Sequence, residues 1–197
     1  MSGICAIVLA AGESKRMGYP KMLLDFHGKT MLETVINNVK ASGVDDILVV
    51  LGAYRNELEN IVMKTGIRSC YNDIYKEGML TSVQCGFRNI PDKTEAVLVF
   101  QGDQPLITSK VIVKVIEEYK RSGKGLVIPV YKNRRGHPLL VAGKYYSEIG
   151  KLDPQRGLRS LPEIFSSDVE EVVVDECGIL RDFDTFEEYR NEINQIH

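Results

Sequence analysis

Short apolar runs alternate with helical patterns along the whole chain. The runs have the length of strands and are nearly uninterrupted, which is typical of strands in a sheet that is covered on both faces. We expect strands at residues 4–9, 46–51, 67–71, 95–101, 125–131, 137–141 and 169–175. Between them, apolar residues recur at helical spacing at residues 31–42, 55–65, 80–89, 109–122, 144–149, 158–165 and 186–195.

Residues at the ends of these helices support the assignment. Thr30 with Glu33, and Thr185 with Glu188, have the spacing of a capping box, in which side chains and backbone amides bond each other at a helix start. Three glycines stand where a helix C-terminus favours a left-handed residue: Gly43, Gly66 and Gly123.

Strands that alternate with helices indicate parallel βαβ units. The polar stretch 133–136 lies between two strand-like runs and predicts a hairpin-like turn, so one strand should run antiparallel. A chain of 197 residues has the length at which one compact domain is usual. We therefore expect one α/β domain over residues 1–197, with a three-layer α/β/α Rossmann-like fold and a mostly parallel, mixed sheet.

The charge balance limits the possible partners. A formal net charge of -2 provides no global positive field for a nucleic acid or an anionic membrane. The apolar run at residues 4–11 is far shorter than a membrane span of about 20 residues, and no basic segment precedes it. We expect a cytoplasmic protein that binds neither nucleic acid nor membrane.

Cysteines and histidines give no metal pattern. The chain has three histidines and four scattered cysteines, with no pair at the spacing of metal ligands. We expect the cysteines to be reduced and mostly buried, and any metal to be held by oxygen ligands.

A loop of small and basic residues, 9–21, begins where the first expected strand ends. In open α/β sheets, ligands bind beyond the carboxyl ends of the strands. The small residues that open the loop let backbone amides approach an anion, and Arg16 and Lys21 add two cations. A phosphate site and a tight turn with two solvated basic side chains are both consistent with this spacing alone.

Two better-known phosphate loops are excluded. A dinucleotide fingerprint needs G-x-G-x-x-G, but the glycines of this loop are Gly12 and Gly18. The sequence Gly28-Lys29-Thr30 lacks the upstream glycine of a Walker loop, because Leu23 stands there. We interpret it as a turn that leads into the Thr30 cap.

Five motifs give a more specific indication: LAAGESKRMGYPK at 9–21, NDIYKEGMLTS at 72–82, GDQP at 102–105, RRGHP at 134–138 and DFDTFEEY at 182–189. In this order they resemble the small nucleotidyltransferases that make molybdenum cofactor dinucleotides, and within these the molybdenum cofactor cytidylyltransferase branch. The resemblance spans nearly the whole chain and implies the nucleotidyltransferase version of the expected fold.

This resemblance implies a nucleotide site in the first loop. Its residues would be Leu9, Ala10, Ala11, Gly12, Ser14, Arg16, Lys21, Gly102 and Asp103, of which Arg16, Lys21 and Asp103 would also be catalytic. Ala11 matches the LAAG that is typical of the cytidylyl branch, whereas the guanylyl branch typically has LAGG. The resemblance therefore favours CTP.

Acidic residues provide candidate metal ligands. Asp103 follows the expected strand 95–101 and should lie at the carboxyl edge of the sheet, where a carboxylate suits Mg²⁺, although Asp before Gln-Pro also commonly forms a turn. Asp184 is the second candidate, because Thr185 can cap the following helix in its place. Asp182 competes for this role, and the family pattern favours Asp184.

The resemblance also implies an acceptor site, made of Asn72, Glu77, Gly78, Ser82, Gly136, His137 and Pro138. Taken alone, Asn72 indicates a loop, Ser82 a helix surface and His137 a strand edge. Residues 153–159 are similar to a further family element, G-D-x-G-x-R, with a spacing longer by one residue. Four arginines are available to an anionic acceptor or to solvent: Arg134, Arg135, Arg156 and Arg159.

The implied reaction is Mg²⁺-dependent transfer of CMP from CTP to a molybdopterin-type phosphate, with release of pyrophosphate. Such chemistry needs alignment and charge neutralisation rather than a protein nucleophile, which agrees with the lack of a serine elbow in the sequence. Transient contact with molybdoenzyme maturation proteins would follow. The alternatives are a transferase for a sugar or polyol phosphate and a nucleotide-binding regulator without turnover; a dehydrogenase is the weakest.

Overall fold

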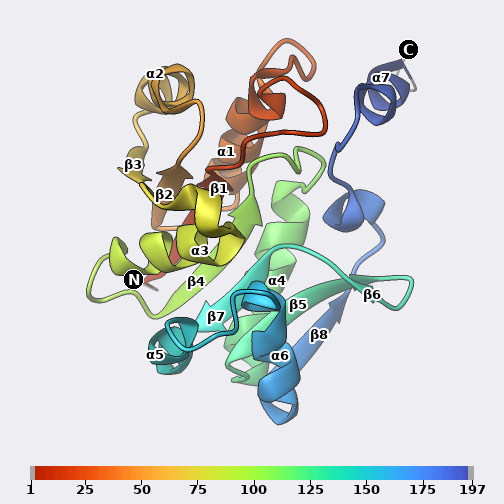
Figure 1. Ribbon diagram of the computed structural model, residues 1–197. Helices are drawn as coiled ribbons and strands as arrows, with labels where there is room; N and C mark the ends of the chain where they lie inside the picture. Colours follow the sequence, from red (N-terminus) through yellow and green to blue (C-terminus); the bar gives the residue numbers. More distant parts are fainter. Residues whose placement is uncertain (1–2, 195–197) are drawn as a thin grey trace.

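Eight strands form one mixed sheet in the computed structural model, which describes residues 3–194 (Figure 1). The strands are β1 (Ile4–Ala10), β2 (Asp46–Leu51), β3 (Arg68–Tyr71), β4 (Ala96–Gln101), β5 (Leu126–Tyr131), β6 (Arg134–Arg135), β7 (Leu139–Ala142) and β8 (Val169–Val173). Their order is β3-β2-β1-β4-β7-β5-β6, and β8 also pairs with β5. The strands β6 and β7 pair antiparallel with their neighbours and all other pairs are parallel, which confirms the mixed, mostly parallel sheet.

Seven α-helices connect these strands or follow them in the described residues. They are α1 (Met31–Ala41), α2 (Arg55–Thr65), α3 (Met79–Arg88), α4 (Ser109–Ser122), α5 (Tyr146–Ile149), α6 (Leu161–Ile164) and α7 (Phe186–Asn194). Both expected capping boxes are present, at Thr30 with Glu33 and at Thr185 with Glu188. The expected end of the last helix, Gln195, lies outside the described residues.

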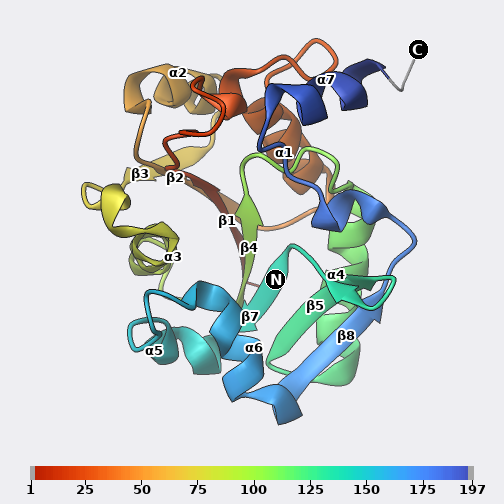
Figure 2. The ribbon, with the colours of Figure 1, turned by 45° about the vertical axis from the view of Figure 1, so that its right-hand side comes forward.

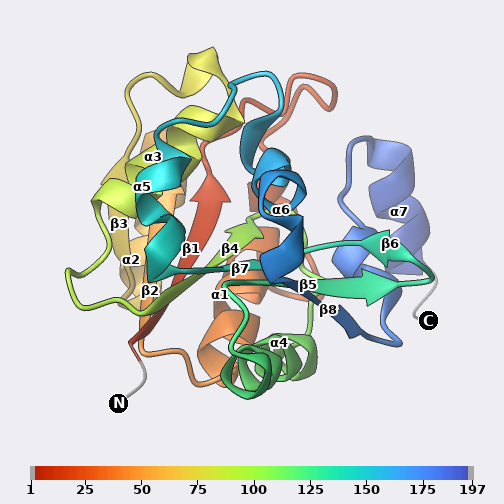
Figure 3. The same ribbon diagram turned by 90° about the horizontal axis from the view of Figure 1, so that it is seen from below.

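The helices cover both faces of the sheet and make three layers, as expected (Figure 3). On one face, α1, α2 and α4 pack against alternate residues of the central strands, including Ala6 and Val8. On the other, α3, α5 and α6 pack against the residues between them, including Ile7 and Val99. Because β1 and β4 are apolar at nearly every position, both of their faces are buried.

The C-terminal helix α7 lies outside these layers, next to the loop that follows β1 (Figure 2). Phe183 and Tyr189 pack in a small cluster with Met17 and Phe26, and the Tyr189 hydroxyl donates a 2.5 Å hydrogen bond to the Asp25 carbonyl. This contact brings the last acidic motif of the chain beside its first loop.

Two expectations about local structure are wrong. The strand expected from His137 begins at Leu139, after a cis peptide bond between His137 and Pro138, where proline provides no N–H for a ladder. The cysteines are all free, but only Cys5 and Cys85 are buried, whereas Cys177 is exposed. Among residues 3–194, no helix is both long and apolar enough to cross a membrane.

Candidate active site

The loop after β1 is held in shape by its own hydrogen bonds. The Ser14 carbonyl accepts from the amides of Met17 and Gly18, each at 3.0 Å, and the Ser14 hydroxyl accepts from the Lys21 amide at 3.2 Å. Ser14 and Gly18 both have positive φ, of 49° and 66°. The loop is therefore wound back on itself, so that Lys21 points to the carboxyl edge of the sheet.

A second contact fixes the start of this loop against the end of β2. The Ala53 amide donates to the Ala11 carbonyl at 3.1 Å. A Cβ atom on Gly52 would lie 2.7 Å from both the Cβ and the carbonyl oxygen of Ala11. Glycine is required here because the two backbone segments approach too closely for any side chain. Ala11 is thereby held at the wall of the crevice.

Lys21 lies between two carboxylates that come from distant parts of the chain. Its Nζ is 2.5 Å from Asp103 Oδ2 and 3.2 Å from Asp184 Oδ1. The side chains of Lys21 and Asp103 are 14% and 8% exposed, so this ion pair is shielded from water. Asp184 is also paired with Arg16, whose side chain is mostly exposed. Four charged groups of alternating sign thus meet at the carboxyl ends of β1 and β4.

The electrostatic state of this cluster follows from these contacts. Burial lowers the pKa of Lys21, but the charges and hydrogen bonds of Asp103 and Asp184 outweigh it, so the net pKa lies above its usual value. Lys21 is therefore an ammonium at neutral pH. Burial, followed by the charge of Asp103, raises the pKa of the neighbouring Asp182. Asp182 has no ion pair of its own among the described residues, in contrast to Asp184.

Glu188 leaves the Asp184 carboxylate available for this cluster. Its Oε2 accepts from the amides of Asp184, at 2.9 Å, and Thr185, at 3.0 Å. The first turn of α7 is therefore capped without the Asp184 side chain, as expected from the sequence.

The cluster lines a cavity of about 250 Å³, and two further cavities adjoin it, of about 340 and 370 Å³. Gln101, the last residue of β4, lines all three. Leu9 and Met79 line both the 250 Å³ and the 340 Å³ cavities. His137 and Arg159 line both the 340 Å³ and the 370 Å³ cavities. The three spaces are therefore parts of one crevice along the carboxyl edge of the sheet.

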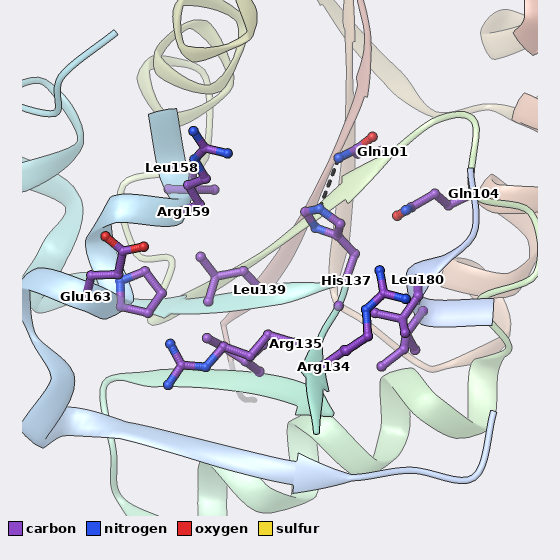
Figure 4. Close-up of a pocket in the computed structure, with 14 residues that line it drawn as sticks. Gln101, Gln104, Arg134, Arg135, His137, Leu139, Leu158, Arg159, Glu163 and Leu180 are labelled. Atoms are coloured by element: carbon purple, nitrogen blue, oxygen red, sulfur yellow. Dashed lines mark hydrogen bonds between the residues drawn. The ribbon is translucent and has the colours of Figure 1, made fainter. Parts of the chain in front are cut away.

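Figure 4 shows the cavity farthest from Lys21. The ring of His137 and the carboxamide of Gln101 share a hydrogen bond, with 3.0 Å between Nε2 and Nε2. Burial lowers the pKa of His137, so the ring is neutral at neutral pH. Cationic side chains from two different segments, Arg134 and Arg159, also line this cavity.

The structure brings some of the expected site residues to the crevice and leaves others out. Those that line it are Leu9, Ala11, Gly12, Arg16, Lys21, Ser82, Asp103, Gly136, His137 and Asp184. Those that are not among its lining residues are Ala10, Ser14, Asn72, Glu77, Gly78, Gly102 and Pro138.

The contacts of several residues in the second group explain why they do not line the crevice. Ala10 is fully buried in the core, and the Ser14 hydroxyl is used by the Lys21 amide. The side-chain amide of Asn72 donates hydrogen bonds to the hydroxyls of Thr81 and Ser82, at 2.8 and 3.0 Å, so it joins the loop after β3 to α3. Gly102 lets β4 end close to the first loop, since a Cβ there would lie 3.0 Å from the Leu9 carbonyl oxygen. These residues shape the crevice rather than face it.

Comparison with known proteins identifies the family. The sequence profile of the MobA-like NTP transferase domain matches residues 6–171. The chain belongs to this family. It is 34% identical over 143 residues to the molybdenum cofactor cytidylyltransferase of Escherichia coli K12, covering 72% of this chain and 71% of the relative. It is also 36% identical over 123 residues to the bifunctional protein GlmU of Clostridium tetani, covering 60% of this chain and 26% of that protein.

Solved structures agree on the fold of this MobA-like transferase. Rv0371c from Mycobacterium tuberculosis H37Rv superposes with a TM-score of 0.86 at 23% identity, covering 98% of each chain. Rv0371c in complex with manganese superposes with a TM-score of 0.79 at 22% identity, covering 97% of this chain and 98% of that chain. The chain is therefore a nucleotidyltransferase with the expected α/β fold, and the resemblance seen in its motifs is confirmed at the level of the family.

Several residues of the transferase crevice were not predicted as site residues. They include Met22, Tyr75, Met79, Gln101, Gln104 and Glu163, with several apolar residues of the walls. Gln101 had a readable signal, because it is the one polar residue of the run AVLVFQ and stands at its carboxyl end. Gln104 lies inside the GDQP motif, but nothing in that motif shows which way its side chain points.

The donor set of this transferase fits a hard divalent cation. Asp103 and Asp184 both direct carboxylate oxygens at Lys21 Nζ, and carboxylate oxygens are ligands that hard divalent cations prefer. No group of three or more His, Cys, Asp or Glu side chains within residues 3–194 could hold a metal alone. Mg²⁺ commonly takes one or two carboxylates and completes its coordination with phosphates and water, which agrees with this sparse set.

Proposed function

We propose that the protein transfers CMP from CTP to a molybdopterin-type phosphate and releases pyrophosphate, with Mg²⁺ as its metal. The observation that carries this proposal is the position of Lys21 Nζ between the Asp103 and Asp184 carboxylates, at the carboxyl ends of β1 and β4. Two carboxylates suited to a divalent cation and a lysine suited to phosphate oxygens meet there, which supports a site for a nucleoside triphosphate.

The bond changes need little covalent help from the protein. An oxygen of the acceptor phosphate forms a bond to the α-phosphorus of CTP, and the bond from that phosphorus to the bridging oxygen breaks. The electron pair leaves with pyrophosphate. Lys21 and Arg16 neutralise the charge that develops on the α-phosphoryl group and on pyrophosphate, and the backbone of the first loop holds the triphosphate.

Asp103 and Asp184 would hold Mg²⁺, which supplies charge neutralisation at the phosphates when bound. The carboxylates and Lys21 balance one another in the free protein, and the same ammonium is available to phosphate oxygens once the triphosphate has bound. The manganese complex of Rv0371c, a protein of the same fold, supports the use of a divalent ion.

Ala11 supports CTP as the nucleotide. Its side chain lines the crevice and packs against Gly52, so the wall cannot recede there without removing the Cβ of Ala11. A purine requires more room than a pyrimidine, which favours cytosine. The E. coli relative, a molybdenum cofactor cytidylyltransferase, agrees with this choice and with the acceptor.

A screen of pyrophosphate release tests the proposal. Each of CTP, GTP, ATP and UTP is mixed with the enzyme, Mg²⁺ and one acceptor: molybdopterin, a sugar phosphate or a polyol phosphate. We expect the fastest release from CTP with molybdopterin. Faster release from GTP would overturn the assignment of CTP as the nucleotide. Faster release with a sugar or polyol phosphate would overturn the assignment of molybdopterin as the acceptor. CTP binding without release from any pair would indicate a regulator.

A further inference from the structure

Two of the four cysteines meet where α3 packs against β3. Cys70 lies in β3 and Cys85 in α3, and their Sγ atoms are 3.7 Å apart. This is the one sulfur–sulfur hydrogen bond within residues 3–194. Neither cysteine is among the lining residues of the transferase crevice. The proposed chemistry therefore makes no use of this pair of thiols.

Neighbouring contacts hold the two sulfurs together. The Cys85 thiol donates to the Tyr71 carbonyl at 3.6 Å, so Cys70 is the donor in the sulfur–sulfur contact. Two residues after Cys70, the Asn72 side chain donates to two hydroxyls in the first turn of α3. The strand, the loop after it and the helix are thus fastened to one another on both sides of the thiols. Each thiol therefore has its partner at a high effective concentration.

A disulfide is within reach of this arrangement. The sulfurs of a disulfide are about 2.05 Å apart, so the two Sγ atoms need to approach by about 1.6 Å. Rotation of the two side chains about their Cα–Cβ bonds is the simplest way to bring them closer. Cys70 is half-buried and Cys85 is buried, so an oxidant in solution meets Cys70 first.

The electrostatic state of Cys70 determines what kind of disulfide this would be. Burial, followed by the neighbouring Cys85, raises the pKa of the Cys70 thiol. Few thiolates are therefore present at neutral pH, and oxidation is slow. The same surroundings do not stabilise the ionised, reduced form, so a bond once formed resists reduction. These properties are typical of a structural disulfide rather than a catalytic one.

The strand β3 is a place where a covalent link would matter. It is an edge strand of four residues, and β2 is its strand partner in the sheet. Short edge strands open more readily than the central strands of a sheet. The helix α3, by contrast, packs on the central strands and lines the crevice through Met79 and Ser82. A link between the two elements fastens the edge of the sheet to the wall of the crevice.

We propose that Cys70 and Cys85 form a disulfide under oxidising conditions and that this bond clamps β3 to α3. The Cys70 thiolate attacks one sulfur of a small-molecule disulfide, such as glutathione disulfide, and releases one thiolate. The Cys85 thiolate then attacks the Cys70 sulfur of this mixed disulfide and releases the second thiolate. In total the two cysteines lose two protons and two electrons, and the oxidant gains them as two thiols. The inference is independent of the proposed function, because it involves no nucleotide, metal or acceptor.

Peptide mapping tests the inference on the full chain with the change Cys177→Ser, which removes the exposed thiol and so prevents cross-links between molecules. The protein is kept in glutathione disulfide at alkaline pH, free thiols are alkylated, and trypsin is added. Trypsin places the two cysteines in separate peptides, 69–76 and 77–88. We expect mass spectrometry to find these two peptides joined by a bond that dithiothreitol breaks.

A second sample is refolded from urea in the same buffer, so that burial of the thiols does not limit the reaction. Recovery of both peptides in alkylated form from both samples would overturn the inference. Glutathione attached to Cys70 without closure to Cys85 would overturn it as well. The further change Cys70→Ser should leave the peptide 77–88 unlinked to 69–76.

Melting temperature tests the clamp. The oxidised Cys177→Ser protein should melt about 5 °C or more above the same protein in dithiothreitol, because the closed loop restricts the unfolded chain. Cys70→Ser in the same background is the control: its circular dichroism should match that of the parent, and its melting temperature should be the same in both buffers. A linked protein that melts no higher than the reduced one would overturn the clamp.

Discussion

The two ends of the crevice are polar for opposite reasons. At the first loop, Lys21, Asp103 and Asp184 neutralise one another at 2.5 and 3.2 Å, so the protein satisfies its own charges. At the distant end, Oε1 of Gln104 is buried without a hydrogen-bond partner within residues 3–194, and Arg134 lines the same cavity with no ion pair to any residue of that range. Figure 4 shows this cavity, in which the Gln104 carboxamide points toward the His137 ring and the ring is hydrogen-bonded to Gln101.

This difference predicts two different modes of ligand binding at the two ends of the crevice. Under the proposed function, binding at the first end would be an exchange, because a triphosphate and a divalent cation would replace the internal ion pairs of Lys21, Asp103 and Asp184 by new ones. A ligand at the distant end would instead add a hydrogen bond to a buried oxygen that has no partner within residues 3–194. Substitutions at the first end should therefore disturb turnover and metal binding, and those at the distant end acceptor choice.

The largest effect is expected from Asp103→Asn. This change keeps the shape of the side chain and removes the carboxylate that faces Lys21, so pyrophosphate release should fall on the order of 100-fold or more. Circular dichroism should show an intact fold. Asp46→Asn is the control, since Asp46 pairs with Arg68 at the start of β2, away from the crevice. Near-normal turnover in Asp103→Asn would remove this residue from the mechanism.

Lys21→Met tests whether the ammonium competes with a divalent ion. Without Lys21, the Asp103 and Asp184 carboxylates face each other unneutralised, so Mn²⁺ should bind the variant about tenfold tighter than the wild type in the absence of nucleotide. Electron paramagnetic resonance of free Mn²⁺ measures this. Turnover should be lost. Lys151→Met, which removes an exposed ion pair, is the control, and equal Mn²⁺ affinity in all three proteins would contradict the competition.

Ala11→Gly tests the wall beside Gly52. Removing this Cβ creates room in the crevice, so kcat/KM for GTP relative to CTP should rise by about tenfold. The ratio is measured by pyrophosphate release with one acceptor, so each nucleotide serves as the control for the other. An unchanged ratio would place the choice of base elsewhere in the crevice.

The smallest effect concerns Asp182, whose pKa is raised by burial and by the charge of Asp103. A raised pKa in the folded state means that ionised Asp182 costs stability above that pKa and that the cost vanishes below the ordinary value of 3.8. Asp182→Asn should therefore melt slightly above the wild type at neutral pH, and the difference should disappear as the solution is acidified. A difference that persists in acid would exclude this electrostatic origin.

Much of the fold could be predicted from the sequence, because its determinants are local. Apolar runs such as Ile4–Ala10 define buried strands, and Thr30 or Gly123 marks a helix end by itself. The start of β7 was misplaced because the strand-like run 137–141 includes a proline, and the bend at His137 depends on its contact with the Ile179 carbonyl, far along the chain.

In the candidate site, too, some positions follow from local sequence and topology, and others depend on contacts between distant parts of the chain. Lys21 and Asp103 lie directly after buried strands, so their place at the carboxyl edge follows from topology. Asn72 was expected at the acceptor, but its bonds to Thr81 and Ser82 turn it into the protein, and no local pattern shows this. Gln104 was not predicted to line the crevice, because the burial of its Oε1 without a partner within residues 3–194 depends on the packing of the whole fold.

The most direct test of the account follows the two ends of CTP through one reaction. Enzyme, Mg²⁺ and molybdopterin are incubated with CTP that carries ³²P at the α-position or, separately, at the γ-position. The account predicts that the α-label appears in a cytidine dinucleotide of the acceptor and the γ-label in pyrophosphate. An α-label that remains in CTP, or that appears in free CMP while the acceptor is unchanged, would contradict nucleotidyl transfer to this acceptor.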